Sequence, residues 1–245
     1  MDTCGRRVML ADLSIFADAL RFIEENPGLM WDKTVEHLVL SAASIGIALA
    51  IALPIGVGLG HLRRYSFVAI SISNIGRALP TLAVIAVCIV FLPVGFTVVL
   101  ISLVVLAVPP ILTNAYVGVS EVDLDTVDAA RGMGMTERQI LQRVELPLAA
   151  PLLFSGIRTA VVFVVASATI AAIAGGGGLG DVIVNQASYG IEGVIGASIL
   201  VSALAFACDG AVALVQRLVT PRPLRGRHVD DAMLVTEPGG KGLTL

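Results

Sequence analysis

Two arginines, Arg77 and Arg158, lie within long apolar stretches of this 245-residue sequence. A cation is costly in a stretch that crosses a membrane, so it marks either a solute pathway or a structural contact. Asp209 is the acidic residue within these stretches, near the end of the last one. Three kinds of partner stay open for the arginines: a salt bridge, backbone carbonyls freed by a proline, or snorkelling to the membrane surface.

Small polar residues and prolines recur in the same stretches. Such residues either line a polar path for a solute or make hydrogen bonds between helices, and their spacing fits both interpretations. Together with Arg77, the candidates for a translocation path are Asn74, Pro80, Thr81, Pro109, Pro110, Asn114 and Thr169.

Other kinds of reactive site find little support in the sequence. The three cysteines are far apart and form no CxxC pair, so neither a disulfide framework nor a zinc site is indicated. No G-x-x-x-x-G-K-[ST] motif is present, so no nucleotide site is expected. Aromatic residues make up only 5% of the chain, too few to suggest an aromatic cage. We expect no catalytic residue, metal or cofactor in this chain.

The composition is that of a membrane protein. Hydrophobic residues make up 56% and charged residues 14%, and the mean hydropathy is +0.91. A soluble domain carries about a quarter charged residues, so that class is excluded. The net charge of -3 gives no sign of nucleic-acid binding.

The apolar stretches predict an all-α membrane protein with about five transmembrane helices. A span needs about 20 apolar residues. Arg77 is placed inside the second span, because a span that began after it would be too short. We expect Pro109 and Pro110 to interrupt the third span, and the polar segment 181–192 to be a loop that can hold a short helix. The predicted spans are 38–60, 67–92, 96–117, 148–174 and 193–215.

The distribution of lysine and arginine predicts the orientation. Ten of these residues fall on the side of the central polar stretch and the C-terminal tail, and four fall on the other side. The positive side is usually cytoplasmic, so we expect the N-terminus outside and the C-terminus inside, in the plasma (inner) membrane. We interpret residues 1–33 as an amphipathic helix on the outer surface and 216–245 as a disordered cytoplasmic tail.

The central polar stretch, 120–147, predicts two short helices bent at a glycine. Val122 to Gly134 has acidic residues in its first turns and glycines at its end. Thr136 and Gln139 have the spacing of a capping box that opens a second helix, and Pro147 is expected to redirect the chain into the fourth span. Such a pair forms either a compact unit facing the cytoplasm or an amphipathic connector resting on the membrane.

The same stretch resembles a known family. An acidic residue and two alanines, then a glycine, then an aliphatic-x-Leu-Pro group match the EAA signature of permease subunits of bacterial ATP-binding-cassette (ABC) importers. The matching residues are Asp128, Ala129, Ala130, Gly134, Val144, Leu146 and Pro147. Asp128 stands for the usual Glu and Val144 for the usual Ile. Segments 77–82, 132–136, 144–149, 156–160, 168–172 and 177–180 look like the osmoprotectant branch, which imports glycine betaine, carnitine, choline or proline betaine.

The resemblance implies a type I ABC importer permease fold, working with several partners. Its EAA loop would dock on a cytoplasmic ATPase dimer, which binds ATP and Mg, so this chain would transport without hydrolysing ATP. A second copy or a similar permease would complete the pore. An extracytoplasmic substrate-binding protein would dock on the outer loops, and the candidate residues there are Gly177, Gly178, Gly180 and Asp181.

Three alternatives remain open. The chain could be a permease for methionine, a sulfonate or another small solute. It could be a secondary transporter, although that class needs intramembrane carboxylates for ion coupling. It could also be a membrane subunit without transport, which leaves the EAA spacing unexplained.

Overall fold

A computed structural model describes residues 2–63, 67, 71 and 81–220 of the chain. Within these ranges every regular element is a helix. Four helices are long and apolar enough to cross a membrane, and one of them, α8, continues an upstream helical segment that starts at Glu137. They are α2 (Pro27–His61), α5 (Phe96–Ser120), α8 (Leu146–Ala171) and α10 (Gln186–Val219). The prediction of an all-α membrane protein is confirmed.

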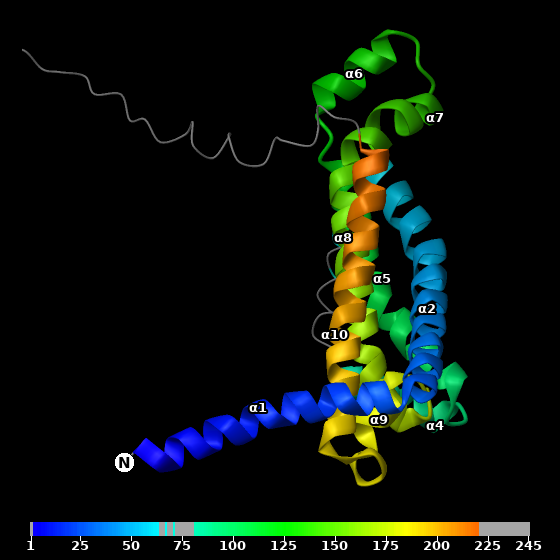
Figure 1. Cartoon of the computed structure of the whole chain (residues 1–245). Coiled ribbons are helices and arrows are strands. Elements are labelled where there is room, and N and C mark those ends of the chain that lie inside the picture. Colours follow the sequence, from blue (N-terminus) through cyan, green and yellow to red (C-terminus); the bar gives the residue numbers. More distant parts are fainter. Residues whose placement is uncertain (1, 64–66, 68–70, 72–80, 221–245) are drawn as a thin grey trace, which may run out of the picture.

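The long helices form a bundle in which α5 packs against α2 and α8, and α8 packs against α10 (Figure 1). The core between α2, α5 and α8 includes Leu40, Leu103, Ile111 and Val164, each at most 1% exposed. Small residues let these helices approach closely, as membrane helices require. At Gly156, for example, an added Cβ would lie 2.7 Å from the carbonyl oxygen of Pro110.

Four of the five predicted spans correspond to these helices. The second, 67–92, is described only at 67, 71 and 81–92, and the path candidates Asn74, Arg77 and Pro80 lie outside the described residues. Its described part includes α4 (Thr81–Phe91), a short apolar helix.

The expected break at Pro109 and Pro110 is wrong, because α5 continues through both prolines. Both residues are buried, and the neighbouring helices hold the segment in place. Asn114 donates from Nδ2 to the carbonyl oxygen of Pro110 (2.8 Å), which bonds a polar group inside the apolar helix. Helices in lipid tolerate proline where such local adjustments are available.

Pro147 also does not end a helix. The chain runs from α7 (Glu137–Ile140) through a π-helical turn, η1 (Leu141–Glu145), directly into α8. In this wider turn the N–H of Leu146 donates to Leu141, five residues back. Pro147 is the second residue of α8, so its missing N–H falls at a helix start, where proline costs least.

Two predicted segment boundaries are corrected by the helix bounds. The boundary between 33 and 34 falls inside α2, which begins at Pro27 after a break at Asn26, because proline suits the first position of a helix. The boundary between 215 and 216 falls inside α10, which continues to Val219. The predicted loop 181–192 contains the start of α10, with a non-helical Gly190 (φ 69°, ψ 177°) before the long apolar part. Residues 221–245 lie outside the described part.

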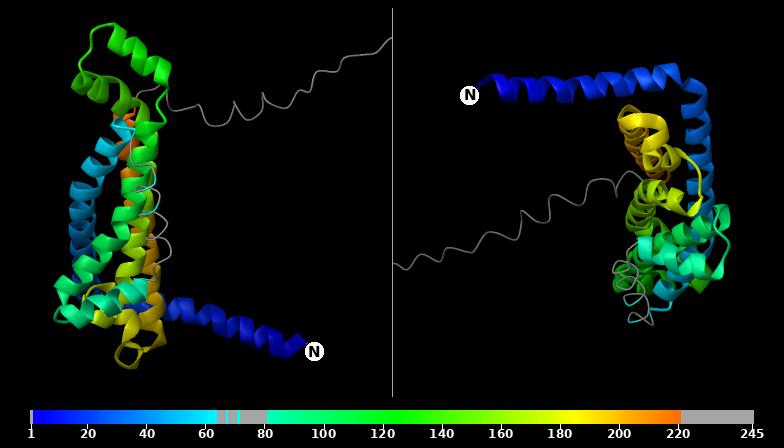
Figure 2. Two further views of the ribbon diagram at one scale, coloured as in Figure 1. Left: turned by 180° about the vertical axis from the view of Figure 1, so that it is seen from behind. Right: turned by 90° about the horizontal axis from the view of Figure 1, so that it is seen from below.

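The two ends of the bundle carry different elements (Figure 1). At one end lie α6 (Leu124–Gly132) and α7, and at the other lie α1 (Asp2–Glu25) and α9 (Leu179–Val184). Figure 2 shows that α1 runs across the bundle and extends away from it. Phe22 and Ile23 of α1 pack near α10, while Phe16 and Leu20 are more than half exposed. An apolar edge that is not covered by the protein suits the interfacial helix that the sequence predicts.

Candidate functional site: a coupling unit and an intramembrane ion pair

Residues 123–145, which comprise α6, α7 and η1, form what we call the coupling unit. Asp123 caps α6, because its carboxylate accepts from the N–H of Asp125 (3.2 Å). Thr136 and Gln139 form a capping box: the side chain of each accepts from the backbone N–H of the other, at 2.8 and 3.4 Å. Both short helices and the capping box are as the sequence predicts.

The coupling unit has a small core of its own. Val127, Ala130 and Ile140 are buried together with Val122, which directly precedes the unit, and Met135 and Val144 pack against them. The chain turns between α6 and α7 at Gly134, whose φ of +81° suits glycine. The two helices therefore share a core and form a compact unit at the end of the bundle (Figure 1).

The signature residues of the coupling unit divide into two groups. Asp128, Ala129 and Gly134 are exposed, whereas Ala130 is buried and Val144 is partly buried. Leu146 and Pro147 are partly buried at the start of α8. Two exposed apolar side chains that sequence reasoning missed, Leu124 (56% exposed) and Met133 (76%), lie on the same unit.

Arg131 ties the two short helices together. Its guanidinium donates to Asp128 (2.9 Å) within α6 and to Glu137 (3.0 Å) at the start of α7. The hydrogen bond and the charge of Glu137, followed by Asp128, raise the pKa of Arg131. The hydrogen bond from Arg131 also lowers the pKa of Glu137, so this ion pair is charged on both sides near neutral pH.

A buried carboxylate joins the coupling unit to α2. Glu145 in η1 is 1% exposed, and its Oε2 lies 2.5 Å from Nδ1 of His61, the last residue of α2. Nearby, the guanidinium of Arg63 donates to the carbonyl of Val122 (2.5 Å). The sequence shows a charged residue within the Val-x-Leu-Pro group but no sign of its partner, because 84 residues separate the two.

Arg158 and Asp209 form an ion pair between α8 and α10. Nε lies 2.7 Å and Nη2 2.6 Å from the two carboxylate oxygens, so the pair is bidentate. Of the partners left open for Arg158, the salt bridge is the one observed. A hollow of about 400 Å³ opens beside the pair.

The remaining path candidates in the described residues are spread over α4, α5 and α8. Asn114 and Thr169 donate to carbonyl oxygens of their own helices, at 2.8 and 2.7 Å. Pro109 and Pro110 are buried, and Thr81 is half-buried at the start of α4. Their role in a path stays a prediction.

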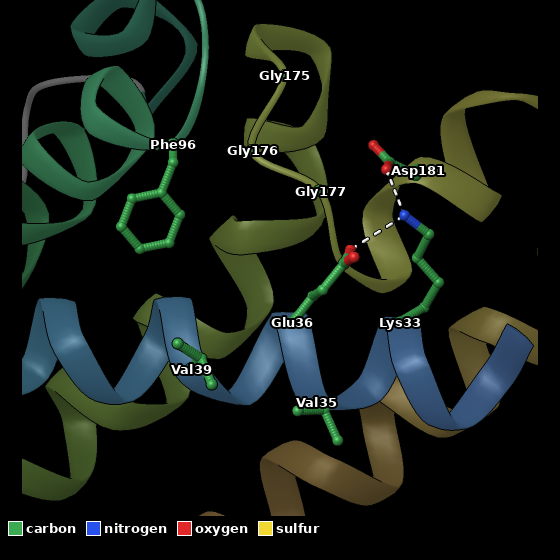
Figure 3. Close-up of a pocket in the computed structure, with 9 residues that line it drawn as sticks. All are labelled: Lys33, Val35, Glu36, Val39, Phe96, Gly175, Gly176, Gly177 and Asp181. Atoms are coloured by element: carbon green, nitrogen blue, oxygen red, sulfur yellow. Dashed lines mark hydrogen bonds and ion pairs between the residues drawn. The ribbon is translucent and has the colours of Figure 1, made fainter. Parts of the chain in front are cut away.

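The outer candidates lie at the end of the bundle opposite the coupling unit. Lys33 bridges Glu36 (3.0 Å) and Asp181 (2.9 Å), and Glu36 accepts from the N–H of Gly178 (2.9 Å). These contacts border a hollow of about 510 Å³ that is also lined by Gly177 (Figure 3).

The four outer candidates differ in accessibility. Gly177 and Asp181 are half-buried, but Gly178 and Gly180 are buried. A Cβ at Gly180 would lie 2.4 Å from the carbonyl oxygen of Thr169, so this glycine allows α9 to pack on α8. Gly178 therefore shapes the loop before α9 and Gly180 the packing of α9, whereas Gly177 and Asp181 are the more accessible pair among the four.

Comparison with known proteins agrees with this architecture. Residues 27–222 match the family described as binding-protein-dependent transport system inner membrane component. The chain is 36% identical over 208 residues to the glycine betaine/carnitine/choline permease protein OpuCB of Bacillus subtilis (strain 168), covering 84% of this chain and 96% of the relative. It is 34% identical over 205 residues to the carnitine permease protein OpuCB of Listeria monocytogenes, covering 83% and 94%.

Solved structures show the same fold. An inward-facing structure of the MetNI methionine ABC transporter superposes with a TM-score of 0.70 at 25% identity, covering 81% of this chain and 99% of that one. An amino acid ABC transporter superposes with a TM-score of 0.60 at 19% identity, covering 81% and 95%.

A bundle of membrane-spanning helices with a compact coupling unit at one end defines the permease subunit of an ABC importer. The chain belongs to the family of inner membrane components of binding-protein-dependent transport systems. The resemblance found in the EAA signature is confirmed, and so is the type I importer fold.

Proposed function

We propose that this permease carries quaternary-ammonium osmoprotectants, such as glycine betaine, choline, carnitine or proline betaine, into the cell. The observation that carries the proposal is the 36% identity with a glycine betaine/carnitine/choline permease over 84% of the chain. Relatives for choline and carnitine match at 36% and 34% identity. The binding protein that delivers these solutes contributes to the preference among them.

A separate ATPase dimer, which binds ATP and Mg, supplies the energy. It docks on the exposed face of the coupling unit, where Ala129 and Met133 are accessible beside Asp128. The contact between His61 and Glu145 transmits movement of the coupling unit to α2. This chain moves solute and hydrolyses nothing itself.

The coupling unit faces the cytoplasm in this proposal, and α1 and α9 face outward. Arg63, Arg131, Arg138 and Arg143 lie in or beside the coupling unit, which follows the positive-inside rule. The binding protein docks at the outer end, near Gly177 and Asp181. A second permease, identical or similar, completes the pore.

The test is uptake by the complete transporter in liposomes, with its ATPase inside and its binding protein outside. Radiolabelled glycine betaine, choline and carnitine are supplied in turn, and ATP-dependent uptake of at least one is expected. Uptake of methionine but of none of these three would overturn the assignment and favour the alternative solute class. Exchange of the binding protein alone then shows which subunit sets the preference.

A further inference from the structure

The ion pair of Arg158 and Asp209 is not enclosed between the helices that it joins. The two side chains are 40% and 28% exposed, and their open side faces the hollow between α8 and α10. Arg158 lies near the middle of α8, twelve residues from its start. Exposed charge at this depth is costly against lipid, so the hollow must hold water, a solute or another polar surface.

The lining of the hollow combines polar and aromatic groups. Ser155, Thr159 and Gln216 lie beside the ion pair, together with Phe163, which is 48% exposed. A second hollow of about 400 Å³ adjoins it, also bordered by Asp209, and is lined by Phe206, which is 80% exposed. The two hollows share Val162 and Asp209, so a guanidinium, a carboxylate and aromatic side chains border adjoining spaces.

We propose that Arg158, Asp209 and this region form a transient binding site for a zwitterionic quaternary-ammonium solute on its way through the membrane. The inference rests on the proposed function and extends it to a particular site. The carboxylate of the solute takes the place of Asp209 on Arg158, and the ammonium group takes the place of Arg158 beside Asp209. Each exchange replaces one ion pair by another, so no charge is left unpaired.

Such an exchange holds a solute without trapping it. The solute must break the existing pair before it gains its own, which keeps the net affinity low, as conduction requires. The quaternary ammonium has no N–H to donate, so it is held by the charge of Asp209 and by the faces of nearby aromatic rings.

The site distinguishes zwitterions from simple cations. Glycine betaine, carnitine and proline betaine carry a carboxylate, whereas choline does not. When choline pairs with Asp209, the charge of Arg158 is left uncompensated within the membrane, which is unfavourable. This step therefore favours the zwitterions, separately from any preference of the binding protein.

The test compares initial uptake rates of glycine betaine and choline by the reconstituted transporter, each at saturating binding protein. Arg158→Gln is expected to lower the ratio of betaine to choline rates by about tenfold, which is the effect of losing one charge-assisted contact. Arg21→Gln serves as the matched control, because it removes a cation from an exposed pair with Asp18 on α1, outside the bundle. The control is expected to leave the ratio unchanged.

The double variant Arg158→Gln/Asp209→Asn distinguishes a solute site from a simple tie between helices. It removes the unpaired charge that either single variant leaves, so it restores folding if charge imbalance alone is harmful. We expect its yield of folded complex to recover while its ratio of betaine to choline rates stays low. A ratio equal to that of the wild type, in either variant, would overturn the inference, whereas absence of uptake by the wild type would contradict the proposed function instead.

Discussion

The coupling unit and the outer end of the bundle are held together in opposite ways. In the coupling unit, the bonds join close neighbours: Asp123 to Asp125, Thr136 to Gln139, and Arg131 to Glu137, at separations of two to six residues. At the outer end, Lys33 contacts Asp181 and Glu36 contacts Gly178, at separations of 148 and 142 residues. One end is built from local contacts and the other from distant ones.

This difference suits the two ends to different work. A unit with its own capping interactions and core can move as one body when a partner pulls on it. His61, the last residue of α2, contacts Glu145 of this unit, and Arg63 just beyond α2 contacts Val122 just before the unit. At the outer end, the loop before α9 is bonded to α2 and packed on α8, so the ends of these helices are held together.

The largest effect is expected from Ala129→Arg and Ala130→Arg. Comparing the two variants distinguishes loss of ATPase docking from loss of folding in the coupling unit. Both are expected to abolish uptake. Ala129 is exposed, so its variant keeps the unit intact and blocks the ATPase surface. Ala130 is 2% exposed, so its variant also disrupts the small core. Limited digestion with chymotrypsin, for which neither substitution adds a site, should cleave the coupling unit faster only in Ala130→Arg. Normal uptake by Ala129→Arg would refute the assignment of the docking surface.

The next largest effect is expected from His61→Ala, which cuts the link between α2 and the coupling unit. It leaves the buried carboxylate of Glu145 without its partner, at a cost of about 3 kcal/mol. A lower Tm of the purified complex is the measurement. The double variant His61→Ala/Glu145→Leu should regain most of the stability, because it removes the buried charge. If the single variant unfolds at the wild-type Tm, the contact between His61 and Glu145 does not stabilise the complex.

At the outer end, Gly180→Val is expected to cost about 1–3 kcal/mol, because the new side chain forces α9 away from α8. The yield of folded complex in detergent and its Tm report this loss. Gly46→Val is the control, since a Cβ at Gly46 meets nothing within 4 Å. Equal losses in both variants would mean that helix propensity, rather than close packing, explains the effect.

The smallest effect is expected from Lys33→Gln, which removes the cation between Glu36 and Asp181. Ion pairs that reach the surface contribute up to about 1 kcal/mol, and the hydrogen bond from Gly178 to Glu36 remains. We expect a small decrease in Tm at low salt. At high salt this decrease should be smaller still, because salt screens the ion pair in the wild type. A decrease as large as that of Gly180→Val would show that charge, more than close packing, holds the outer end.

Much of the candidate site could be predicted where neighbouring residues decide the structure. The capping box at Thr136 and the turn at Gly134 follow from side chains that act within a few residues, so their spacing is enough. Pro109 and Pro110 misled the prediction, because local rules treat proline as a break. Packing against the neighbouring helices supports both buried prolines, and α5 continues through them instead.

By itself the sequence determined the membrane class, most of the spans and the coupling unit, because hydropathy and capping act along the chain. Only the tertiary structure decided which distant groups meet. Arg158 finds Asp209 across 51 residues, and His61 finds Glu145 across 84. Such pairs depend on how helices pack side by side, and a buried charge is tolerated only where that packing supplies its partner.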